Sequence, residues 1–314
     1  MQITFWGVRG SIPTPLTPQR LQNKIASVIQ RVEPKDLVSP ESREAFLADL
    51  PPSLLGTVGG NTTCIELRLA DDTMVIFDAG SGIRELGAEL KKRNDHVRHY
   101  HIFFSHFHWD HIQGLPFFSP VLFDSRCEIT FYSPVAGFES ILRDQMRHPY
   151  FPITMDDVTA KISFQHLDTR ELSIGRARIA YRKMKHPGES FSYRVSEDGH
   201  TMIFSTDTEL SPADFIKDRD NSAFFSNVDC IILDTQYTLG EAIEKYDWGH
   251  SSYSLAVDFA IDWGIKKLVL FHHEPLYDDK KMFNIQKSAR WYAGHLEHKD
   301  VEILLAQEGL VINI

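Results

Sequence analysis

Four side chains that can bind a metal stand close together in the run His-Phe-His-Trp-Asp-His at residues 106–111. The run follows an apolar stretch that we expect to be a strand. Because alternate residues of an extended segment point to the same side, His106 and His108 can bind one cation together. Asp110 and His111 follow where the chain turns, and they can face a second cation. Imidazole and carboxylate ligands without thiolate suit zinc, manganese or iron.

Three further candidate ligands stand downstream, each after an apolar run. His186 lies in Lys-His-Pro-Gly, Asp207 in Phe-Ser-Thr-Asp-Thr, and His272 in Leu-Val-Leu-Phe-His-His. Sites of this kind are built on loops at the ends of buried strands, which is where these residues are expected. His273 is the alternative to His272, because the two histidines are adjacent.

The pattern His-x-His-x-Asp-His, followed in order by a histidine, an aspartate and a histidine, resembles the metallo-β-lactamase superfamily. The resemblance covers nearly the whole chain, from Met1 to the closing strands. It implies a single α/β domain over residues 1–314, built as a four-layer αββα sandwich of two mixed β-sheets flanked by helices. It also implies two divalent metal ions, with Zn²⁺ as the first expectation and Mn²⁺ as the alternative.

The resemblance also implies which residues hold the metals. One metal would be held by His106, His108 and His186, and the other by Asp110, His111 and His272, with Asp207 as the bridging ligand. Asp78, which follows the apolar residues 73–77, resembles a buried aspartate common near such sites. It could orient a ligand histidine through the second ring nitrogen, or it could simply be a turn residue before Gly80.

Two elements resemble the ribonuclease Z-like phosphodiesterase branch of the superfamily. Gly-His-Ser-Ser at residues 249–252 is similar to the His-Ser-Thr element of that branch. Leu-Asp-Thr-Gln-Tyr at residues 233–237 resembles its His-Glu-Ala-Thr element, with Asp234 in place of glutamate and Leu233 in place of histidine. The resemblance implies that Asp234 orients His250, which protonates the leaving oxygen or contacts the phosphate. The alternative is that His250 only caps the following helix.

The expected catalytic residues are therefore Asp110, His250 and Asp234. Two cations that share a water lower its pKa towards neutrality and provide a hydroxide for attack on phosphorus. A poor leaving alkoxide needs a proton, which His250 can supply. A small phosphodiester, such as a cyclic nucleotide, uses all of these groups. The alternatives are a lactonase or thioesterase, which needs the metals but not the acid pair, and a non-catalytic nucleotide-binding relative.

Transfer RNA is not the expected substrate. The ribonuclease Z enzymes that this chain resembles bind tRNA with a long arm, which is inserted between the residues that match His186 and Asp207. In this chain the same segment has room only for a short hairpin. The formal net charge of −10 also disfavours a general nucleic-acid surface, which needs clustered lysine and arginine. A small anionic phosphodiester is the expected partner.

Composition gives expectations about location and assembly. No apolar run reaches transmembrane length, and the first ten residues have the pattern of a strand rather than a signal peptide. Cys64, Cys127 and Cys230 lie in apolar runs, which predicts buried free thiols in a reducing cytoplasm. The apolar segments 115–123 and 148–152 could form a wall of the active site or an interface, and a homodimer is expected from these loops and from the family.

The hydrophobic periodicity predicts the following elements. The segment of about residues 14–58 is rich in proline, and we interpret it as an insertion that acts as a lid, a flap or a dimer contact, with a passive elaboration as the alternative. Strands are expected at 2–8, 61–69, 73–77, 101–105, 127–132, 161–167, 176–184, 191–195, 201–205, 228–233 and 267–271. Helices are expected near 18–32 and 41–49, at 81–92, from about 111, and at 251–262 and 281–297, before a closing hairpin over 301–313 that turns at 308–309.

Overall fold

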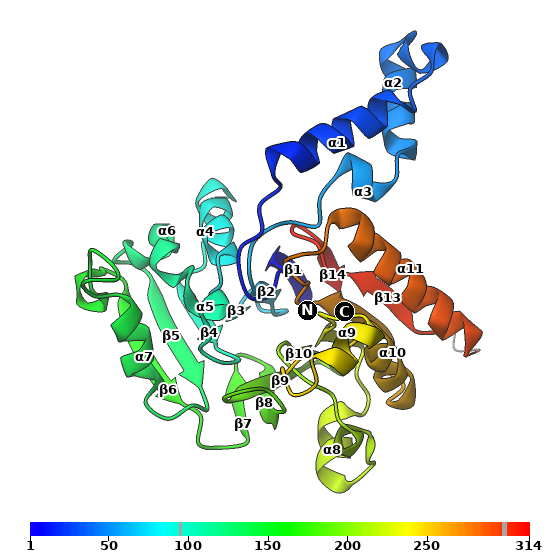
Figure 1. The fold of residues 1–314 in the computed structure, drawn as a ribbon. Coiled ribbons are helices and arrows are strands. Elements are labelled where there is room, and N and C mark those ends of the chain that lie inside the picture. The colour runs from blue at the N-terminus through cyan, green and yellow to red at the C-terminus, as the bar shows by residue number, and fades with distance from the viewer. Residues whose placement is uncertain (94–95, 297–299) are drawn as a thin grey trace.

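The structure of the chain, a computed structural model, describes residues 1–93, 96–296 and 300–314. Within these residues, two seven-stranded sheets pack face to face (Figure 1). The first sheet has the order β14-β1-β2-β3-β4-β5-β6, and the second has the order β13-β12-β11-β10-β9-β8-β7. The predicted arrangement of two mixed sheets is confirmed.

The first sheet contains both strand directions. The neighbours β3, β4, β5 and β6 run parallel, whereas β14, β1, β2 and β3 pair antiparallel. Its strands are β1 (Gln2–Gly7), β2 (Cys64–Arg68), β3 (Met74–Phe77), β4 (His99–Phe103), β5 (Glu128–Ser133), β6 (Lys161–His166) and β14 (Val311–Asn313).

The second sheet is also mixed. The strands β10, β11, β12 and β13 run parallel, and β7 to β10 form an antiparallel meander. Its strands are β7 (Glu171–Ile174), β8 (Ala177–Met184), β9 (Ser190–Glu197), β10 (His200–Ser205), β11 (Cys230–Asp234), β12 (Lys267–Phe271) and β13 (Glu302–Leu305).

Helices cover the outer face of each sheet, which confirms the αββα sandwich. Aromatic side chains from both sheets fill the space between them, including Phe77 and Phe204, whose rings stack 5.1 Å apart. A separate core joins the first sheet to α4, α6 and α7, while α10 and α11 pack on the second sheet. The helices of the sandwich are α4 (Gly82–Arg93), α5 (Trp109–Ile112), η2 (Leu115–Phe117), α6 (Ser119–Leu122), α7 (Phe138–Gln145), η3 (Met155–Asp157), η4 (Pro212–Phe215), α8 (Arg219–Phe225), α9 (Leu239–Glu244), α10 (Tyr253–Asp262) and α11 (Asp279–His295).

The proline-rich segment projects from the sandwich on the side of α11 (Figure 1). It folds into α1 (Pro18–Ile29), η1 (Pro34–Leu37), α2 (Pro40–Asp49) and α3 (Pro52–Leu55), and proline stands in the first turn of each, where its missing N–H costs no hydrogen bond. Its base is fixed to the start of α11. Lys24 Nζ lies 2.6 Å from Asp279 Oδ2, and the Val58 backbone N–H donates to Asp279 Oδ1 at 2.8 Å.

The structure corrects three details of the sequence prediction. The predicted closing hairpin is wrong, because β13 joins the second sheet and β14 the first, so the chain crosses between the sheets instead of turning back. Strand β7 was not expected. The apolar segment 115–123 is mainly core rather than an exposed wall, since Leu115, Phe118 and Leu122 are buried in the core that includes α4. The predicted end of the last helix, residue 297, lies outside the described residues.

Two other expectations concern the thiols and the membrane. All three cysteines are buried and free, as predicted. In the part of the chain that the structure describes, every helix is too short or too polar to span a bilayer.

Candidate metal centre

All seven candidate ligands lie in one cluster at the carboxyl ends of strands from both sheets. Residues 106–111 follow β4 of the first sheet, and His186 follows β8 of the second. Strands β10, β11 and β12 are parallel neighbours, so Asp207, Asp234 and His272 meet where these strands end. In open sheets of parallel strands this edge is the usual place for ligands.

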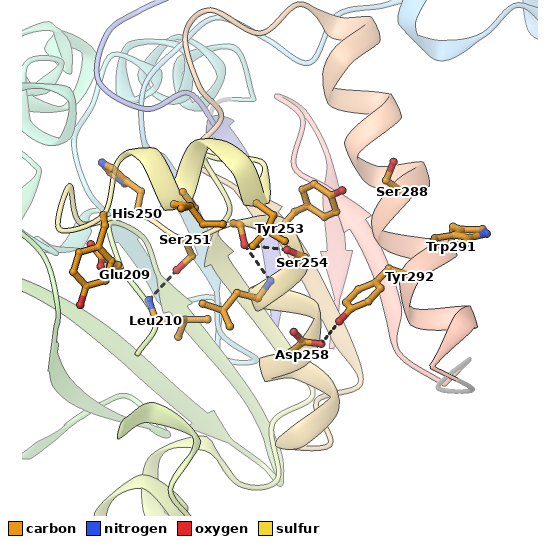
Figure 2. A pocket seen from close by; sticks show the side chains of 16 residues that line it. Glu209, Leu210, His250, Ser251, Tyr253, Ser254, Asp258, Ser288, Trp291 and Tyr292 are labelled. Atoms are coloured by element: carbon orange, nitrogen blue, oxygen red, sulfur yellow. Dashed lines mark hydrogen bonds between the residues drawn. The ribbon is translucent and has the colours of Figure 1, made fainter. Parts of the chain in front are cut away.

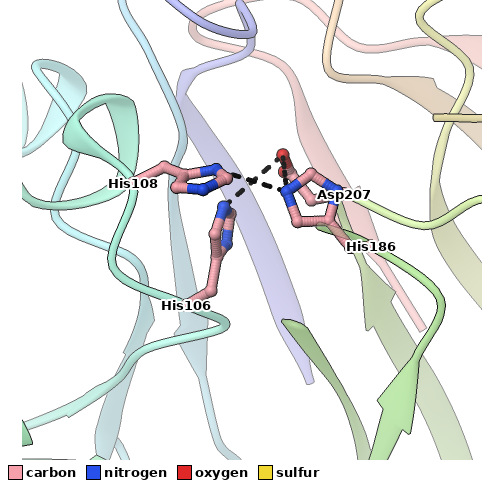
Figure 3. A group of neighbouring side chains, drawn as sticks. All are labelled: His106, His108, His186 and Asp207. Carbon is pink, nitrogen blue, oxygen red and sulfur yellow. Dashed lines mark hydrogen bonds and ion pairs between the residues drawn. The ribbon is translucent and has the colours of Figure 1, made fainter. Parts of the chain in front are cut away.

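The first group of donor atoms comes from His106, His108, His186 and Asp207, whose ligand atoms all lie within 4.8 Å of one another (Figure 3). His186 Nε2 lies 3.2 Å from His108 Nδ1 and 3.8 Å from Asp207 Oδ1. His106 Nε2 lies 3.6 Å from the same oxygen. His108 is exposed, so this group opens to solvent.

The second group lies deeper and contains Asp110, His111 and His272, all of them buried. Their atoms converge on the other oxygen of the same aspartate. His111 Nε2 lies 3.1 Å from Asp207 Oδ2, and His272 Nε2 also lies 3.1 Å from it. Asp110 Oδ2 lies 3.2 Å from His111 Nε2 and 3.3 Å from His272 Nε2.

Asp207 therefore stands between the two groups, with Oδ1 facing the first and Oδ2 facing the second. Burial alone would raise the pKa of this carboxyl, but His272, His111 and His106 outweigh that effect and hold its pKa well below the usual range. An ionised carboxylate with one oxygen directed at each group has the geometry of a bridging ligand.

The donor atoms fit divalent cations better than they fit one another. The buried Nε2 atoms of His106 and His111 have no hydrogen-bond partner of good geometry among the described residues. Buried polar atoms are normally satisfied, so unsatisfied imidazole nitrogens that face carboxylates indicate a place for an ion. Burial and the neighbouring histidines also lower the pKa of His106 well below its usual value, which leaves its ring neutral, as metal ligation requires.

The pKa of His111 shifts in the opposite direction. Burial would lower it, but the carboxylates of Asp110, Asp207 and Asp78 raise it well above the usual value. A proton on Nε2 and a metal cation would neutralise the same carboxylates, so they compete for this position. The electrostatics of the second group therefore favour a positive charge at this point.

Asp78 supports the second group from behind, as expected for a residue that orients a ligand. The His111 Nδ1–H donates to Asp78 Oδ2 at 2.8 Å, which leaves Nε2 to face the cluster. Ser105 donates to the same carboxylate twice, through its backbone N–H to Oδ1 and through Oγ to Oδ2, each at 2.7 Å. Burial, the largest influence, raises the pKa of Asp78 above its usual value despite these partners.

The backbone is strained at several residues of the cluster. Asp78, Asp207 and His272 have positive φ angles of 59°, 48° and 60°, which side-chain-bearing residues rarely adopt. Strain of this kind persists where the surroundings fix a residue in place, and it concentrates at functional sites. At Gly249 the φ angle is +88°, and a Cβ there would lie 2.2 Å from His186 Nδ1, so only glycine fits.

His250 and Asp234 form the hydrogen-bonded pair that the sequence predicted, beside the candidate ligands. The His250 Nδ1–H donates to Asp234 Oδ2 at 2.7 Å, and the His250 ring stacks on His272 at 5.1 Å. Burial would lower the pKa of His250, but Asp234 and the more distant Asp207 and Asp110 raise it to about 9. His250 is therefore directed into the site, and helix α10 is capped by Ser252 instead.

The structure brings His272, and not His273, into the cluster. His273 turns away, and its Nε2 lies 2.9 Å from the backbone oxygen of Ala306. Burial lowers the pKa of His273 to about 3, so its ring is neutral and serves as a hydrogen-bond donor to that oxygen. The two adjacent histidines, which both follow the end of β12, therefore make different contacts: His272 faces the cluster and His273 the backbone of Ala306.

Sequence reasoning missed four supporting residues. Ser105 could have been found from the sequence, because it immediately precedes the histidine run. Ser11 donates its backbone N–H to Asp110 Oδ2 at 2.7 Å, and a Cβ at Gly10 would lie 2.5 Å from the His272 ring. Glu209 holds two ligand loops together: it accepts from Lys185 Nζ at 2.6 Å and from the Gly249 N–H at 2.9 Å. Nothing in the sequence around Glu209 pairs it with Gly249.

Known proteins are similar to this chain in sequence and in fold. A ribonuclease Z of Lactiplantibacillus plantarum is 26% identical over 295 residues, covering 77% of this chain and 93% of that protein. A crystal structure of a diphosphatase from the PhnP family superposes with a TM-score of 0.65 at 15% identity, covering 100% of this chain and 97% of that chain. Human tRNase Z, short form, gives a TM-score of 0.58 at 18% identity, covering 100% and 99% of the two chains.

The family is shown by the sequence itself. Residues 73–273, which include the histidine run and all the other candidate ligands, match the β-lactamase superfamily domain. The paired sheets and flanking helices agree with that match. The chain belongs to the β-lactamase superfamily and has the fold of its metal-dependent hydrolases.

Proposed function

We propose that this protein is a dinuclear metal-dependent phosphodiesterase that acts on a small nucleotide, cyclic or linear, or on a related phosphodiester. The observation that carries the proposal is the hydrogen-bonded pair of His250 and Asp234, placed beside a cluster that can hold two ions. An ester or lactone hydrolase would use the ion cluster alone. A proton donor held next to it is most useful for a poor alkoxide leaving group.

His106, His108, His186 and Asp207 are proposed to hold one divalent ion, and Asp110, His111, His272 and Asp207 the other. Zn²⁺ is proposed first and Mn²⁺ second, because imidazole and carboxylate suit both. When bound, such ions activate a water and neutralise the charge that develops on the phosphoryl oxygens.

The remaining steps use the chain's own side chains. Asp110 is proposed to accept a proton from the attacking water while the water oxygen forms a bond to phosphorus. The bond from phosphorus to the leaving oxygen breaks, and that oxygen takes the Nε2 proton of His250. Asp234 fixes the His250 ring through Nδ1 and stabilises its cationic form. The products are a phosphomonoester and an alcohol, which are parts of one molecule when the substrate is cyclic.

Three observations support a small substrate over tRNA. The segment between His186 and Asp207 folds as the hairpin β9–β10, which turns at Asp198 and Gly199. The net charge of −10 opposes a long polyanion. The first group of ligands opens to solvent through His108, which offers a small anion an approach.

Location and assembly stay proposals as well. The three buried free thiols support a reducing compartment, and we propose the cytoplasm. Exposed apolar side chains on α1, namely Leu21, Ile25 and Ile29, support a homodimer.

Parallel assays on metal-replete protein test the proposed reaction. Hydrolysis of bis(p-nitrophenyl) phosphate is measured beside an acyl-homoserine lactone and a glutathione thioester. Phosphodiester turnover without turnover of the other two is the expected result. Turnover of the lactone or thioester alone would overturn the assignment to phosphodiesters, and binding of a cyclic nucleotide without any turnover would indicate a non-catalytic relative.

A further inference from the structure

A cavity lies between α9, α10 and α11, beside the candidate metal centre (Figure 2). Its volume is ≈ 590 Å³, within the range of about 300–1,000 Å³ that is typical of sites for small molecules. His250 and Glu209 stand at one end, and Trp291 and Tyr292 stand at the other. His250 thus belongs both to the cavity wall and to a group with Asp207, Asp234 and His272 that could hold a metal ion.

The wall is rich in large apolar and aromatic side chains that are exposed to solvent. Ile243 of α9 is 70% exposed and Trp291 of α11 is 68% exposed, and Leu239 and Tyr246 are also exposed. Large apolar side chains that gather in one hollow mark a binding site far more often than single exposed ones do.

Contacts of neighbouring side chains hold two of the aromatic rings in place. Lys185 Nζ lies 4.3 Å from the centre of the Tyr246 ring, and the Tyr292 hydroxyl donates to Asp258 Oδ1 at 2.8 Å. Lys185 is itself fixed by Glu209 at 2.6 Å. The rings are therefore ordered in advance, which reduces the entropy lost when a flat ligand stacks on them.

The charges of the wall disfavour an anion at the end of the cavity away from His250. Among the described residues, the side chains that line the cavity include the carboxylates of Glu209 and Asp258 but no lysine or arginine. A phosphate at the end away from His250 would face the Asp258 carboxylate without a lysine or arginine in the wall to pair with. The hydroxyls of Ser254 and Ser288 can still bond to an uncharged polar ligand.

We propose that this cavity binds the leaving half of the substrate, and that this half is an uncharged aromatic group of about the size of a nucleoside. The inference rests on the proposed function, because it places the phosphoryl group at the ligand cluster and the leaving alcohol beyond His250. His250 then stands at the boundary between the two halves, where the leaving oxygen takes its proton. Substrates with a second phosphate on the leaving side are disfavoured.

Direct binding of neutral alcohols tests the cavity independently of turnover. Isothermal titration calorimetry measures the affinity of the full-length, metal-loaded protein for adenosine, guanosine, uridine, cytidine and p-nitrobenzyl alcohol. Ile243→Asp introduces a charge into the wall, and Trp291→Ala removes a stacking surface. Ile216→Asp is the matched control, because Ile216 is exposed but lies outside the cavity. Circular dichroism verifies that each variant is folded.

At least one of these alcohols is expected to bind to wild type and to Ile216→Asp with equal affinity. Its affinity for Ile243→Asp and for Trp291→Ala should be at least tenfold lower. The same alcohol should inhibit hydrolysis of bis(p-nitrophenyl) phosphate by wild type. The inference is overturned if none of the alcohols binds, or if the cavity variants bind as wild type does. It is also overturned if Ile243→Asp changes only the oligomeric state, which would make the hollow a contact between copies of the chain.

The two proposals fail in different ways. Phosphodiester turnover without alcohol binding would overturn the leaving-group cavity and leave the proposed function standing. Alcohol binding that depends on Ile243 and Trp291, without turnover of any phosphodiester, would overturn the proposed function and with it the assignment of the cavity to a leaving group.

Discussion

The Nδ1 atom of His250 lies 2.7 Å from Oδ2 of Asp234, and both residues come from the same half of the sandwich. The same carboxylate is held by the backbone N–H groups of Thr208 at 3.3 Å and Ser251 at 3.3 Å. Asp234 is thus fixed on several sides, and it fixes His250 in turn. The site therefore contains a fixed carboxylate–imidazole pair next to Asp207 and His272 of the candidate ligand cluster.

Replacing His250 by alanine should selectively slow the hydrolysis of substrates that have poor leaving groups. For phosphodiesters with alkoxide leaving groups, kcat/KM should fall by about 10²–10⁴-fold, because no proton reaches the leaving oxygen. For p-nitrophenyl leaving groups, which depart unprotonated, the loss should be much smaller. Asp234→Asn should show the same pattern, and metal content should not change.

Exposed His166 provides the matched control for that experiment, and His166→Ala should resemble wild type on every substrate. Steady-state kinetics over a series of leaving groups makes the measurement. Equal losses on alkyl and nitrophenyl substrates in His250→Ala would reject the role of His250 as the proton donor.

Asp207→Ala should reduce the amount of bound metal and lower kcat by about a thousandfold or more, equivalent to about 4 kcal/mol. The reason is that one oxygen of this carboxylate faces each group of ligands. Metal analysis and hydrolysis rates are measured on the same preparations. Asp214→Asn, which changes a buried carboxylate outside the cluster, is the control. Wild-type metal content and rate in Asp207→Ala would exclude the bridging role.

Asp78→Asn should weaken metal binding by about 10–100-fold, because the carboxylate orients His111 through Nδ1. At saturating metal, kcat should return close to that of wild type. Ser105→Ala is a gentler variant that removes one hydrogen bond to Asp78 and should cause a smaller shift in the same direction. Competition with a chromophoric chelator gives the affinities. Unchanged affinity in both variants would show that Asp78 is only a turn residue.

Deleting residues 17–50 should alter either the oligomeric state or the preference for substrate size. The segment projects from the sandwich and exposes apolar side chains on α1. Because the deletion also removes Lys24 and leaves the buried Asp279 without its ion pair, it is combined with Asp279→Asn. Light scattering and substrate kinetics make the measurement.

The substitution pair Ile25→Lys and Ile29→Lys is the companion to this deletion, since it removes the apolar surface of α1 and keeps the segment. A dimer that dissociates in both proteins would locate the contact on α1. A monomeric wild type with unchanged substrate preference after deletion would show that the insertion is passive.

The ligand cluster could be predicted because its signal is local and chemical. His106, His108, Asp110 and His111 are close in sequence, and the distant ligands each end an apolar run. The strands could be predicted from the hydrophobic periodicity, and the four layers from the resemblance to the superfamily. Asp234 and His250 were found through short motifs rather than through periodicity.

Other features depend on contacts that no local pattern encodes. Strands β13 and β14 have the pattern of a hairpin, but a better pairing partner exists for each in a different sheet. Glu209 lies two positions after Asp207, yet its role comes from Lys185 and Gly249, which are distant in sequence. The cavity beside His250 arises only when α9, α10 and α11 come together.

The most direct test of the account is a metal titration of stripped protein, with bound metal and hydrolysis of bis(p-nitrophenyl) phosphate measured in the same samples. We expect no turnover without metal, binding of two divalent ions per chain, and activity that rises to its full value as the second ion binds. Turnover that survives complete metal removal, or none at all with two ions bound, would contradict a dinuclear metal-dependent phosphodiesterase.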